Sequence, residues 1–546
     1  PSNPAYLKPN DHSHRIQNPL DQYYVDVVSR MYPALYTAPL LVNQKNGDHR
    51  PIFFCEYAHA MGNSCGNLTD FWNQWRSMPR VIGGCIWEFK DQGLLKKDSV
   101  GIEYYAYGGD YGEKYFDNFT IKGIVDPAGK IKSPMYECKR IFQPIECSWG
   151  NGKIRVKNRS EVVNANKYEA LLILKENGNI IVSKVLGSLN IAPGNDSLVD
   201  VTTYLPKMKS NSDYHVELNF RLKENTVWAD REHEIASNQF EVQRGYFAEP
   251  LTLSKSKLLV NEDEKETVIK GKNFIIKFGK NKSGLCSYVL NGIEQIKQPL
   301  VPNFKRPLTD NDKRGWKPQR KLKQWYEYEL KQTSTTANQL KDGSVKVSIQ
   351  YSLIHDSAMV NIDYTINDLG RIKVDYQLHV KEGLPNIPKI GMQMGTDRSF
   401  ENINWYGRGP FENYIDKKEA ADVGLYSKPI AQFMENYIVP QESGNRTDVR
   451  WMSLTNNKQQ GLMVVADSLL SMNASIYTDE NIQNAKHTNK LVDAGFIKVD
   501  IDLIQMGVGG NDSWSDVAAP LEQYQIKAKD YRYSFYLMPY QSKKKK

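Results

Sequence analysis

The chain has 546 residues, of which 40% are hydrophobic and 25% charged, a balance that excludes a disordered chain, a collagen and a disulfide-dense miniprotein. It has no run of 18 or more apolar residues, so the sequence predicts no membrane-spanning helix. The formal charge is +8, with four lysines at 543–546. Basic and acidic residues are interspersed elsewhere, so we expect a solvated basic tail and no nucleic-acid partner.

The first 141 residues alternate between short apolar runs and an amphipathic segment. The runs Val25–Tyr32, Ile52–Cys55 and Val81–Trp87 each predict a buried strand. Between the last two runs, Asn67–Met78 places four apolar side chains on one helical face. The order strand, helix, strand predicts parallel strands covered by helices, as in an α/β fold.

Further along the chain, hydrophobic residues recur with a period of two. Residues 345–353, 360–366 and 372–380 alternate strictly between apolar and polar side chains. Such alternation predicts antiparallel strands with one face in a core and the other in water. An Asn-Gly pair at 177–178 is typical of a two-residue hairpin turn. We therefore expect this region to be almost entirely antiparallel β structure.

A break at 244–250, which contains glycine and proline, divides the β region. We expect an α/β part in 1–141, a β-sandwich in 142–245 and a much larger β domain in 246–542, followed by the basic tail. The fold class is therefore a multidomain protein with one α/β part and two all-β parts.

Polar and aromatic side chains follow the predicted parallel strands, at the edge where active sites form in such folds. Glu56 comes directly after one apolar run, and Tyr32 ends the run before it. The next run is followed by Trp87, Glu88 and Asp91. A carboxylate at the mouth of a parallel strand suits a pocket better than a core. The loop after Glu56 adds three further polar side chains: His59, Asn63 and Ser64.

Carboxylates beside aromatic side chains are typical of a glycosidase, which uses one carboxyl group on the anomeric carbon and another to transfer the proton. The alternative interpretation is structural. In that case Glu56 makes an ion pair or contacts the start of a helix, and Trp87 belongs to a core.

Two motifs carry a resemblance to a known family. PIFFCEYAHAMGNS and GGCIWEFKDQGL resemble the last two barrel strands of the β-galactosidases of glycoside hydrolase family 2. The resemblance continues, in the order of the family, through YAYGGDYG, KGIVDPAGKIKSPMYECKR, RPLTDND, WYGRGPFENYIDK and MGVGGNDSWS. It implies that 1–141 is the C-terminal part of a TIM (β/α)8 barrel. An immunoglobulin-like β-sandwich and a large, galactose-mutarotase-like β super-sandwich then follow.

The resemblance implies roles for four residues of the barrel part. Glu56 matches the nucleophile that forms a covalent glycosyl-enzyme, and Tyr32 matches the tyrosine that hydrogen-bonds this nucleophile. His59 matches a histidine that contacts the sugar, and Trp87 matches the tryptophan that lines the glycone site. The implied reaction is the retaining, exo-acting release of terminal β-D-galactose from β-galactosides.

Two more aromatic residues are implied in the site. Phe119 matches a phenylalanine whose backbone carbonyl helps to bind sodium. Trp514 resembles a tryptophan that reaches the aglycone side from the C-terminal domain. Its setting, GVGGNDSW, favours a loop over a core strand.

Lys122 stands where the family has an asparagine that binds sodium and sugar. An ammonium group does not ligate sodium, so it either replaces the cation or meets an anionic group of the substrate. Lys122 also resembles the uronate-binding lysine of β-glucuronidases, although Thr120 stands where their asparagine is expected. A β-glucuronidase, or a hydrolase of sulfated or other anionic galactosides, is therefore an alternative function. The structural alternative is that Lys122 points to solvent.

The family's proton-donating glutamate lies upstream of the nucleophile in an Asn-Glu motif, and no such motif precedes Glu56. This sequence also lacks the magnesium ligands that the family implies and the two N-terminal β domains of the family. We therefore expect the C-terminal portion of a longer enzyme, or one half of a split enzyme, with negligible hydrolase activity alone.

The same resemblance implies the partners. They are a β-galactoside or oligosaccharide substrate, the missing N-terminal part of the enzyme and further copies in a homo-oligomer, with no organic cofactor and no membrane. The sequence leaves the compartment open between cytoplasm and periplasm. A non-catalytic carbohydrate-binding or assembly module is the competing functional class.

Overall fold

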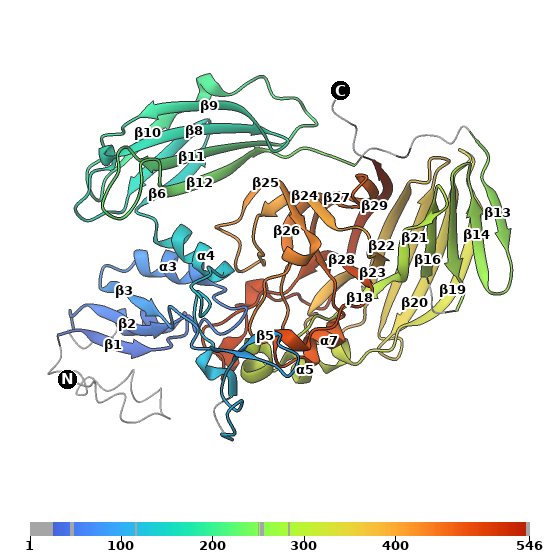
Figure 1. Cartoon of the computed structure of the whole chain (residues 1–546). Coiled ribbons are helices and arrows are strands. Elements are labelled where there is room, and N and C mark those ends of the chain that lie inside the picture. Colours follow the sequence, from blue (N-terminus) through green and yellow to red (C-terminus); the bar gives the residue numbers. More distant parts are fainter. Residues whose placement is uncertain are drawn as a thin grey trace.

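The computed structural model describes residues 26–43, 48–114, 117–248, 251, 256–281 and 284–541. The basic tail expected at 543–546 lies outside the described residues. Figure 1 shows a small α/β part, a separate β-sandwich above it and a large curled β domain beside both. The architecture is therefore mostly β with few helices, which confirms the predicted fold class.

The α/β part is built on a three-stranded parallel sheet in the order β1 (Val28–Met31), β2 (Ile52–Tyr57) and β3 (Val81–Ile86). The predicted helix is α3 (Leu68–Arg76). It packs on the sheet, where Trp75 stacks on a phenylalanine of β2 at 4.8 Å between ring centroids. The parallel strand–helix–strand unit predicted from the hydrophobic pattern is confirmed.

Other short elements surround this sheet. They are α2 (Thr37–Val42), the hairpin of β4 (Leu94–Lys97) and β5 (Glu103–Ala106), the 3₁₀ turn η3 (Asp117–Thr120) and α4 (Ser133–Phe142). Residues of α3 and α4 belong to one hydrophobic cluster with the strands, so helices cover one face of the sheet.

The next part is a sandwich of two antiparallel sheets. One sheet has the order β10 (Asp196–Asp200), β7 (Lys153–Asn158) and β6 (Ile145–Gly150). The other has the order β12 (Glu234–Gln243), β11 (Tyr214–Leu222), β8 (Tyr168–Glu176) and β9 (Asn179–Gly187). Buried aliphatic side chains from both sheets form one core. Asn177 and Gly178, with φ of 50° and 78°, form the predicted hairpin turn between β8 and β9.

The described residues of the large β domain form one curled antiparallel sheet of seventeen strands. The strands are β13 (Leu259–Glu262), β14 (Glu266–Lys270), β15 (Phe274–Gly279), β16 (Gly284–Leu290), β17 (Ile293–Glu294), β18 (Ile296–Asn303), β19 (Lys331–Gln339), β20 (Val345–Leu353), β21 (Ala358–Ile366), β22 (Ile372–Val380), β23 (Lys389–Asp397), β24 (Asn402–Gly409), β25 (Asp422–Pro429), β26 (Arg446–Thr455), β27 (Gln460–Ser475), β28 (Phe496–Gln505) and β29 (Tyr531–Gln541).

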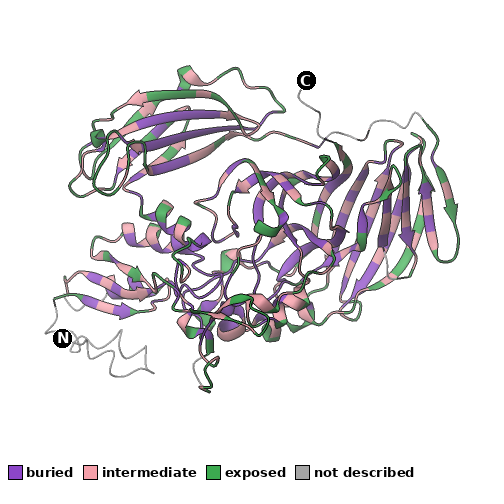
Figure 2. Ribbon diagram, in the orientation of Figure 1, coloured by how far each residue is buried: buried purple, intermediate pink, exposed green. Residues whose placement is uncertain are grey.

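The sheet closes on itself through cross-pairings such as β18 with β23 and β22 with β29. The three alternating segments found in the sequence are β20, β21 and β22, whose apolar positions point into the core (Figure 2). Short helices α5 (Pro318–Lys321), α6 (Lys323–Tyr326) and α7 (Asp479–Asn484) lie in the connections. Among the described helices, none has the length and apolar composition needed to cross a membrane.

Candidate active site

Glu56 and Tyr32 lie together at the carboxyl ends of β2 and β1. The Tyr32 backbone N–H donates to the Glu56 carbonyl oxygen at 2.8 Å, which sets the two residues side by side. Burial, the interaction of the phenol with the Glu56 carboxyl group and the charge of Glu88 raise the pKa of Tyr32 well above its ordinary value. The phenol therefore stays protonated and donates to the carboxylate. The structure brings this predicted pair into contact.

The backbone around the pair adopts left-handed conformations that side chains other than glycine seldom take. Tyr32 has a φ of 47°, and Ala58, just after β2, has a φ of 48°. Each such residue costs about 1 kcal/mol or more and is held by its surroundings. Strained backbone at the ends of adjacent strands is typical of functional sites, because it aims side chains that a regular strand would direct elsewhere.

His59 joins this pair to an aromatic group from the far end of the chain. Its ring lies edge-on to Tyr32 at 5.7 Å and to Trp514 at 5.2 Å between centroids. Trp514 also lies edge-on to Tyr32 at 4.6 Å and is 46% exposed. Phe119 is 6.4 Å from His59, and the guanidinium of Arg314 lies over its ring. The structure thus places Trp514 beside the Tyr32–Glu56 pair, in a loop and not in a core.

Trp87 follows β3 and is half-buried. Its carbonyl oxygen accepts from the Ala60 N–H at 2.7 Å, and its own N–H donates to the Tyr57 carbonyl at 3.2 Å. The next N–H, of Glu88, donates to the Lys122 carbonyl at 2.7 Å. These bonds join the loops that follow β2 and β3 to the segment after η3, so Trp87 lies close to the loop that carries His59.

Lys122 forms an ion pair with Glu88, with the Nζ and Oε1 atoms 2.8 Å apart. Both side chains are mostly buried, at 15% and 21% exposed, so the idea that Lys122 points to solvent is wrong. Gln92 donates a second hydrogen bond to Glu88 at 2.6 Å. Burial, reinforced by the charge of Lys122, lowers the pKa of His59 to about 3. His59 is therefore neutral near pH 7. The charge of Lys122 near it is balanced by that of Glu88.

The sodium ion implied by the resemblance does not fit this arrangement. The ammonium of Lys122 already occupies the position beside Glu88, and a second cation there would meet like charge. Within the described residues there is also no group of three or more His, Cys, Asp or Glu side chains placed to hold a metal ion.

Three polar residues named with the candidate site are buried in structural surroundings. Asn63 is fully buried, accepts from Lys417 at 2.7 Å and donates to the Glu442 carbonyl at 2.9 Å. Ser64 is also fully buried. Asp91 forms a buried ion pair with Lys132 at 2.9 Å, so the structure places it in a structural contact and not in a pocket. Asn63 and Asp91 look functional in sequence because their partners lie far away along the chain.

The loop 58–67 is anchored directly on the large β domain. The N–H of Gly66 donates to the Gly509 carbonyl at 2.8 Å, and the N–H of Asn67 donates to the Asp416 carbonyl at 2.9 Å. The Asp416 carboxylate in turn accepts from the N–H groups of Val508 and Gly509, at 3.0 and 2.8 Å. The glutamate-bearing strand and the tryptophan-bearing loop are thus joined by backbone contacts.

Sequence reasoning named no role for Asn311 or Ser513, although both stand in motifs that carried the resemblance. Ser513 contacts His59, and Asn311 contacts Ser513. Arg314, over Phe119, was also missed. These residues lie in or near the motifs RPLTDND and MGVGGNDSWS, which were the available signal. The sequence alone does not show that the two motifs contact each other in the folded chain.

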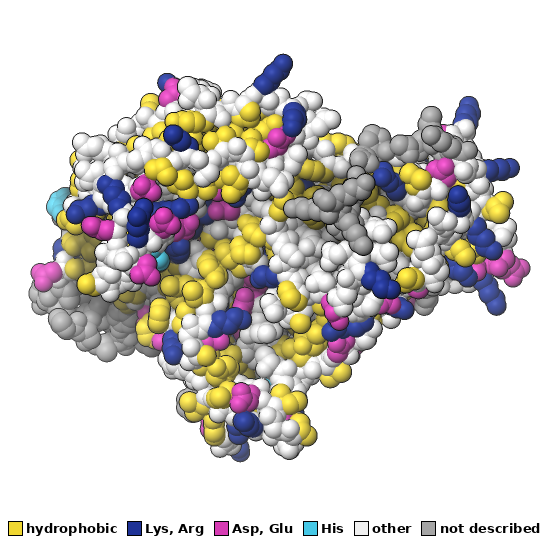
Figure 3. Space-filling model, turned by 45° about the horizontal axis from the view of Figure 1, so that its top comes forward, with side chains coloured by type: hydrophobic (Ala, Val, Ile, Leu, Met, Phe, Trp, Pro, Cys, Tyr) yellow, Lys and Arg dark blue, Asp and Glu magenta, His cyan; other side chains and the backbone are white. Residues whose placement is uncertain are grey.

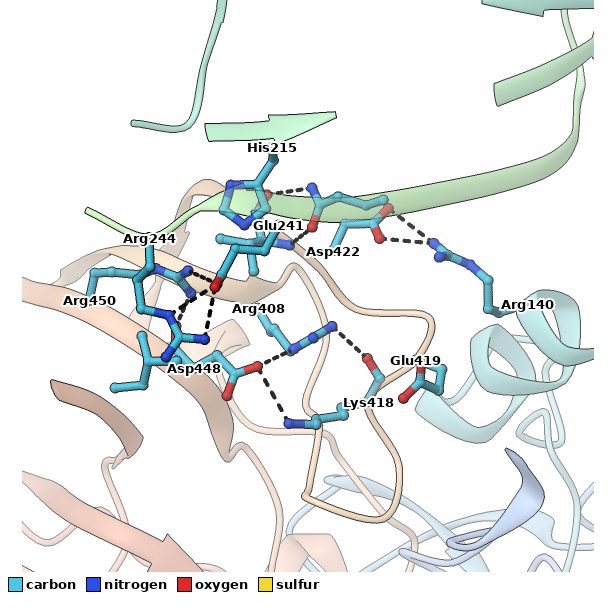
Figure 4. A pocket seen from close by; sticks show the side chains of 13 residues that line it. Arg140, His215, Glu241, Arg244, Arg408, Lys418, Glu419, Asp422, Asp448 and Arg450 are labelled. Carbon is cyan, nitrogen blue, oxygen red and sulfur yellow. Dashed lines mark hydrogen bonds and ion pairs between the residues drawn. The ribbon is translucent and has the colours of Figure 1, made fainter. Parts of the chain in front are cut away.

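A polar cavity of about 330 Å³ lies away from this site, where the sandwich meets the large β domain (Figure 4). Most of its charged groups are paired with one another. Arg140 binds both oxygens of Asp422 at 3.0 Å, and Arg450 bridges the sandwich through Glu241 at 3.0 Å. We therefore interpret this cavity as part of an ion-pair network between the β-sandwich and the large β domain.

Comparison with known proteins matches almost the whole chain. Residues 8–147 match the TIM barrel domain of the glycosyl hydrolases of family 2. Residues 154–243 match domain 4 of β-galactosidase, and residues 270–537 match the β-galactosidase small chain. This chain belongs to glycoside hydrolase family 2. The resemblance on which the sequence prediction relied is thereby confirmed.

Curated relatives of this family 2 chain are named β-galactosidase. The protein from Priestia megaterium is 33% identical over 523 residues, covering 94% of this chain and 50% of the relative. Those from Halalkalibacterium halodurans and Streptococcus thermophilus are each 30% identical, covering 92% and 95% of this chain and 50% and 52% of the relative. The chain thus spans about half the length of the curated relatives it matches.

Proposed function

We propose that this chain carries the nucleophile side of a retaining exo-β-galactosidase. The observation that carries the proposal is the pair Tyr32–Glu56, joined by a backbone hydrogen bond of 2.8 Å at the ends of two parallel strands, with the rings of His59 and Trp514 against Tyr32. A carboxylate held by a protonated phenol, beside aromatic side chains, suits attack on a sugar ring.

In the proposed reaction a carboxylate oxygen of Glu56 attacks the anomeric carbon as the glycosidic C–O bond breaks. The leaving oxygen takes a proton from a general acid, and water later releases galactose from the covalent glycosyl-enzyme. Tyr32 orients the carboxylate before attack and stabilises it when it leaves. Trp514 presents an aromatic surface on the exposed side of the pair.

Glu88 does not suit the role of general acid, because its side chain is already engaged by Lys122 at 2.8 Å and by Gln92 at 2.6 Å. We propose that the acid comes from polypeptide outside the described residues, in further barrel strands. The sheet of β1, β2 and β3 supports this, since a closed barrel of this type needs eight strands and, among the described residues, no strand pairs with the outer edge of β1 or of β3. The missing strands would be the main protein partner of the chain.

Two alternative functions receive less support. The anionic-substrate alternatives, a β-glucuronidase or a hydrolase of sulfated galactosides, need a free positive charge at Lys122. That charge is neutralised by Glu88 at 2.8 Å. A non-catalytic carbohydrate-binding module would not need a protonated Tyr32 next to the Glu56 carboxylate at the end of a strand.

Trapping with a 2-fluoro-galactosyl reagent tests the proposal, because it arrests the glycosyl-enzyme. The chain would be assayed together with a polypeptide that supplies the remaining barrel strands. We expect one label on the peptide that contains Glu56, and no label in Glu56→Gln. Glu88→Gln is the matched control and should still be labelled. If no label appears on Glu56, the non-catalytic module becomes the better reading.

A further inference from the structure

His59, Ser513 and Asn311 form a line of buried side chains beside Trp514. Ser513 Oγ lies 2.8 Å from His59 Nδ1 and 2.7 Å from Asn311 Oδ1. The three side chains are 2%, 0% and 0% exposed, so bulk water does not compete for these bonds. The order of donors and acceptors along this line decides which imidazole nitrogen carries the proton.

The orientation of Asn311 sets that order. Its Nδ2 donates to the Val508 carbonyl oxygen at 3.1 Å, and a carbonyl oxygen only accepts. Asn311 Oδ1 therefore faces Ser513 and receives the serine hydroxyl proton. A serine hydroxyl has one proton to donate, so Ser513 must accept from His59. The hydrogen on that ring consequently sits on Nδ1.

The other nitrogen of the ring is then an acceptor. Burial and the neighbouring charge of Lys122 lower the pKa of His59 to about 3, so the ring holds a single proton near neutral pH. Within the described part of the chain, the hydrogen bond of the ring is the one that Nδ1 makes with Ser513. Nε2 keeps its lone pair for a ligand.

We propose that Ser513 and Asn311 are positioning residues that hold His59 as the Nδ1–H tautomer, so that Nε2 accepts a hydrogen bond from a hydroxyl group of a neutral sugar. The inference rests on the proposed galactosidase function and narrows its substrate class. A hydroxyl has a proton to give, whereas a carboxylate or sulfate oxygen would set its lone pairs against that of Nε2. Lys122, already paired with Glu88, offers no compensating charge.

The tautomer is measured by two-bond ¹H–¹⁵N NMR on the full chain labelled at histidine, with His59→Gln to assign the signals. At pH 7 we expect a protonated nitrogen at Nδ1 and an unprotonated nitrogen at Nε2. Ser513→Ala removes the acceptor of Nδ1–H, so the ring should move to the Nε2–H form, whereas Ser513→Thr keeps a hydroxyl and should keep Nδ1–H. A protonated Nε2 in the wild-type chain, or an unchanged tautomer in Ser513→Ala, overturns the proposal.

The proposed hydroxyl contact is tested by binding of methyl β-galactoside and its monodeoxy analogues to the chain completed by the remaining barrel strands. Ser513→Ala should weaken binding of the parent sugar about fivefold, the equivalent of one neutral hydrogen bond. The analogue that lacks the contacted hydroxyl should bind wild type and Ser513→Ala equally. Equal weakening across all analogues overturns the hydroxyl contact.

The two measurements separate this inference from the function on which it rests. The tautomer is read without any ligand. An Nδ1–H ring in a wild-type chain that binds no galactoside even when completed by the remaining barrel strands would reject the galactosidase and its hydroxyl contact while supporting the positioning role. Galactoside binding with a protonated Nε2 would support the galactosidase and reject the positioning role.

Discussion

Two hydroxyl groups from opposite ends of the chain each orient one polar group of the site. Tyr32 donates to Glu56, and Ser513 accepts from His59. Both groups are next to Trp514: the Tyr32 ring contacts it in space, and Ser513 precedes it in the chain. At the scale of single residues, neighbouring groups therefore determine where the protons of the site lie, on the Tyr32 hydroxyl and on Nδ1 of His59.

Tyr32→Phe removes the phenol that donates to Glu56. Loss of one preorganised donor at a reacting group lowers turnover by about 10²-fold, and we expect a loss of this size in the rate of glycosyl-enzyme formation. The measurement is a pre-steady-state rate with an aryl β-galactoside, in the enzyme completed by the proposed barrel strands. Tyr36→Phe is the control, since Tyr36 is 62% exposed and should be silent. Equal rates for the two variants would contradict the role of Tyr32.

Lys122→Ala removes the partner of Glu88. Because the pair is already neutral as a unit, we expect kcat/KM to fall to a similar degree for neutral and sulfated galactosides, with their ratio unchanged. The ratio is measured by competition between the two substrates. Lys130→Ala, at a lysine whose side chain is 63% exposed, is the control for a simple change of net charge. A ratio that shifts tenfold toward the neutral substrate would instead show that Lys122 recognises an anionic group.

Elements of the barrel part and of the large β domain meet by close backbone contact. Gly66 is central because a Cβ atom there would lie 2.1 Å from Asp416 Oδ2 and 3.0 Å from the Gly509 nitrogen. Contacts of this length are not found in real structures, so one element would have to move. The loop after β2 is therefore held in one position against residues 506–515.

Gly66→Ala should destabilise the chain by about 1–3 kcal/mol, the usual cost of overpacking a tight contact. Urea unfolding measures the change. Gly150→Ala is the matched control, because a Cβ there meets no atom within 4 Å, and we expect little change in its free energy of unfolding. If Gly66→Ala costs no more than the control, the two elements are not rigidly joined.

Strand β11 carries a buried histidine that makes stability depend on pH. His215 is 2% exposed, and burial, then the charges of Arg450 and Arg408, lower its pKa to about 4. Asp213 opposes this shift, and Lys175 adds to it. A histidine has a pKa of about 6.5 in an unfolded chain. Between pH 6.5 and 4 the unfolded state therefore binds more protons, so the free energy of unfolding falls as the pH is lowered.

The contribution of His215 to this acid loss is up to about 3 kcal/mol, at 1.36 kcal/mol for each unit of pKa difference. We expect His215→Gln to lose stability less steeply than wild type between pH 6.5 and 4, whatever its stability at pH 7. The readout is the slope of the free energy of unfolding against pH. His233→Gln, at an exposed histidine, should keep the wild-type slope. An unchanged slope in His215→Gln would contradict the prediction.

On the scale of the whole molecule, a network of charged residues joins the β-sandwich to the large β domain. Arg450 of β26 donates to Asp213 at 2.8 Å and to Glu241 of β12 at 3.0 Å. Tyr406 donates to the same Asp213 oxygen at 2.9 Å. Figure 3 shows basic and acidic side chains intermixed on the viewed surface, and the cavity in Figure 4 lies at this junction.

Asp213→Asn removes the charge that Arg450 meets in the interior. Breaking a buried pair costs about 3–5 kcal/mol when the other charge is left without compensation. Arg450 keeps Glu241 at 3.0 Å, so we expect a loss toward the lower end of this range. Asp196→Asn is the control, since its ion pair with Arg155 is exposed and should contribute less than about 1 kcal/mol. Guanidinium unfolding and hydrogen exchange of the sandwich measure both. Similar small effects in the two variants would show that the buried network does not hold the two domains together.

The sequence by itself determined the strands and the candidate carboxylate. The parallel runs, the helix between them and the period-two strands follow from local hydrophobic pattern, which depends only on neighbours in the chain. Glu56 and Tyr32 were found for the same reason, because each stands at the end of an apolar run. The family motifs then placed Trp514 and His59 in one site before any distance was known.

Only the tertiary structure decided which polar groups are paired. Asp91 has the sequence setting of a site residue but is buried against Lys132, and Lys122 is neutralised by Glu88. Hydrogen bonds and ion pairs act over a few ångströms in space, and their partners here are 34 to 454 residues apart in the chain. The protonation of His59 depends on Ser513 for the same reason, so it became readable only once both ends of the chain had been brought together.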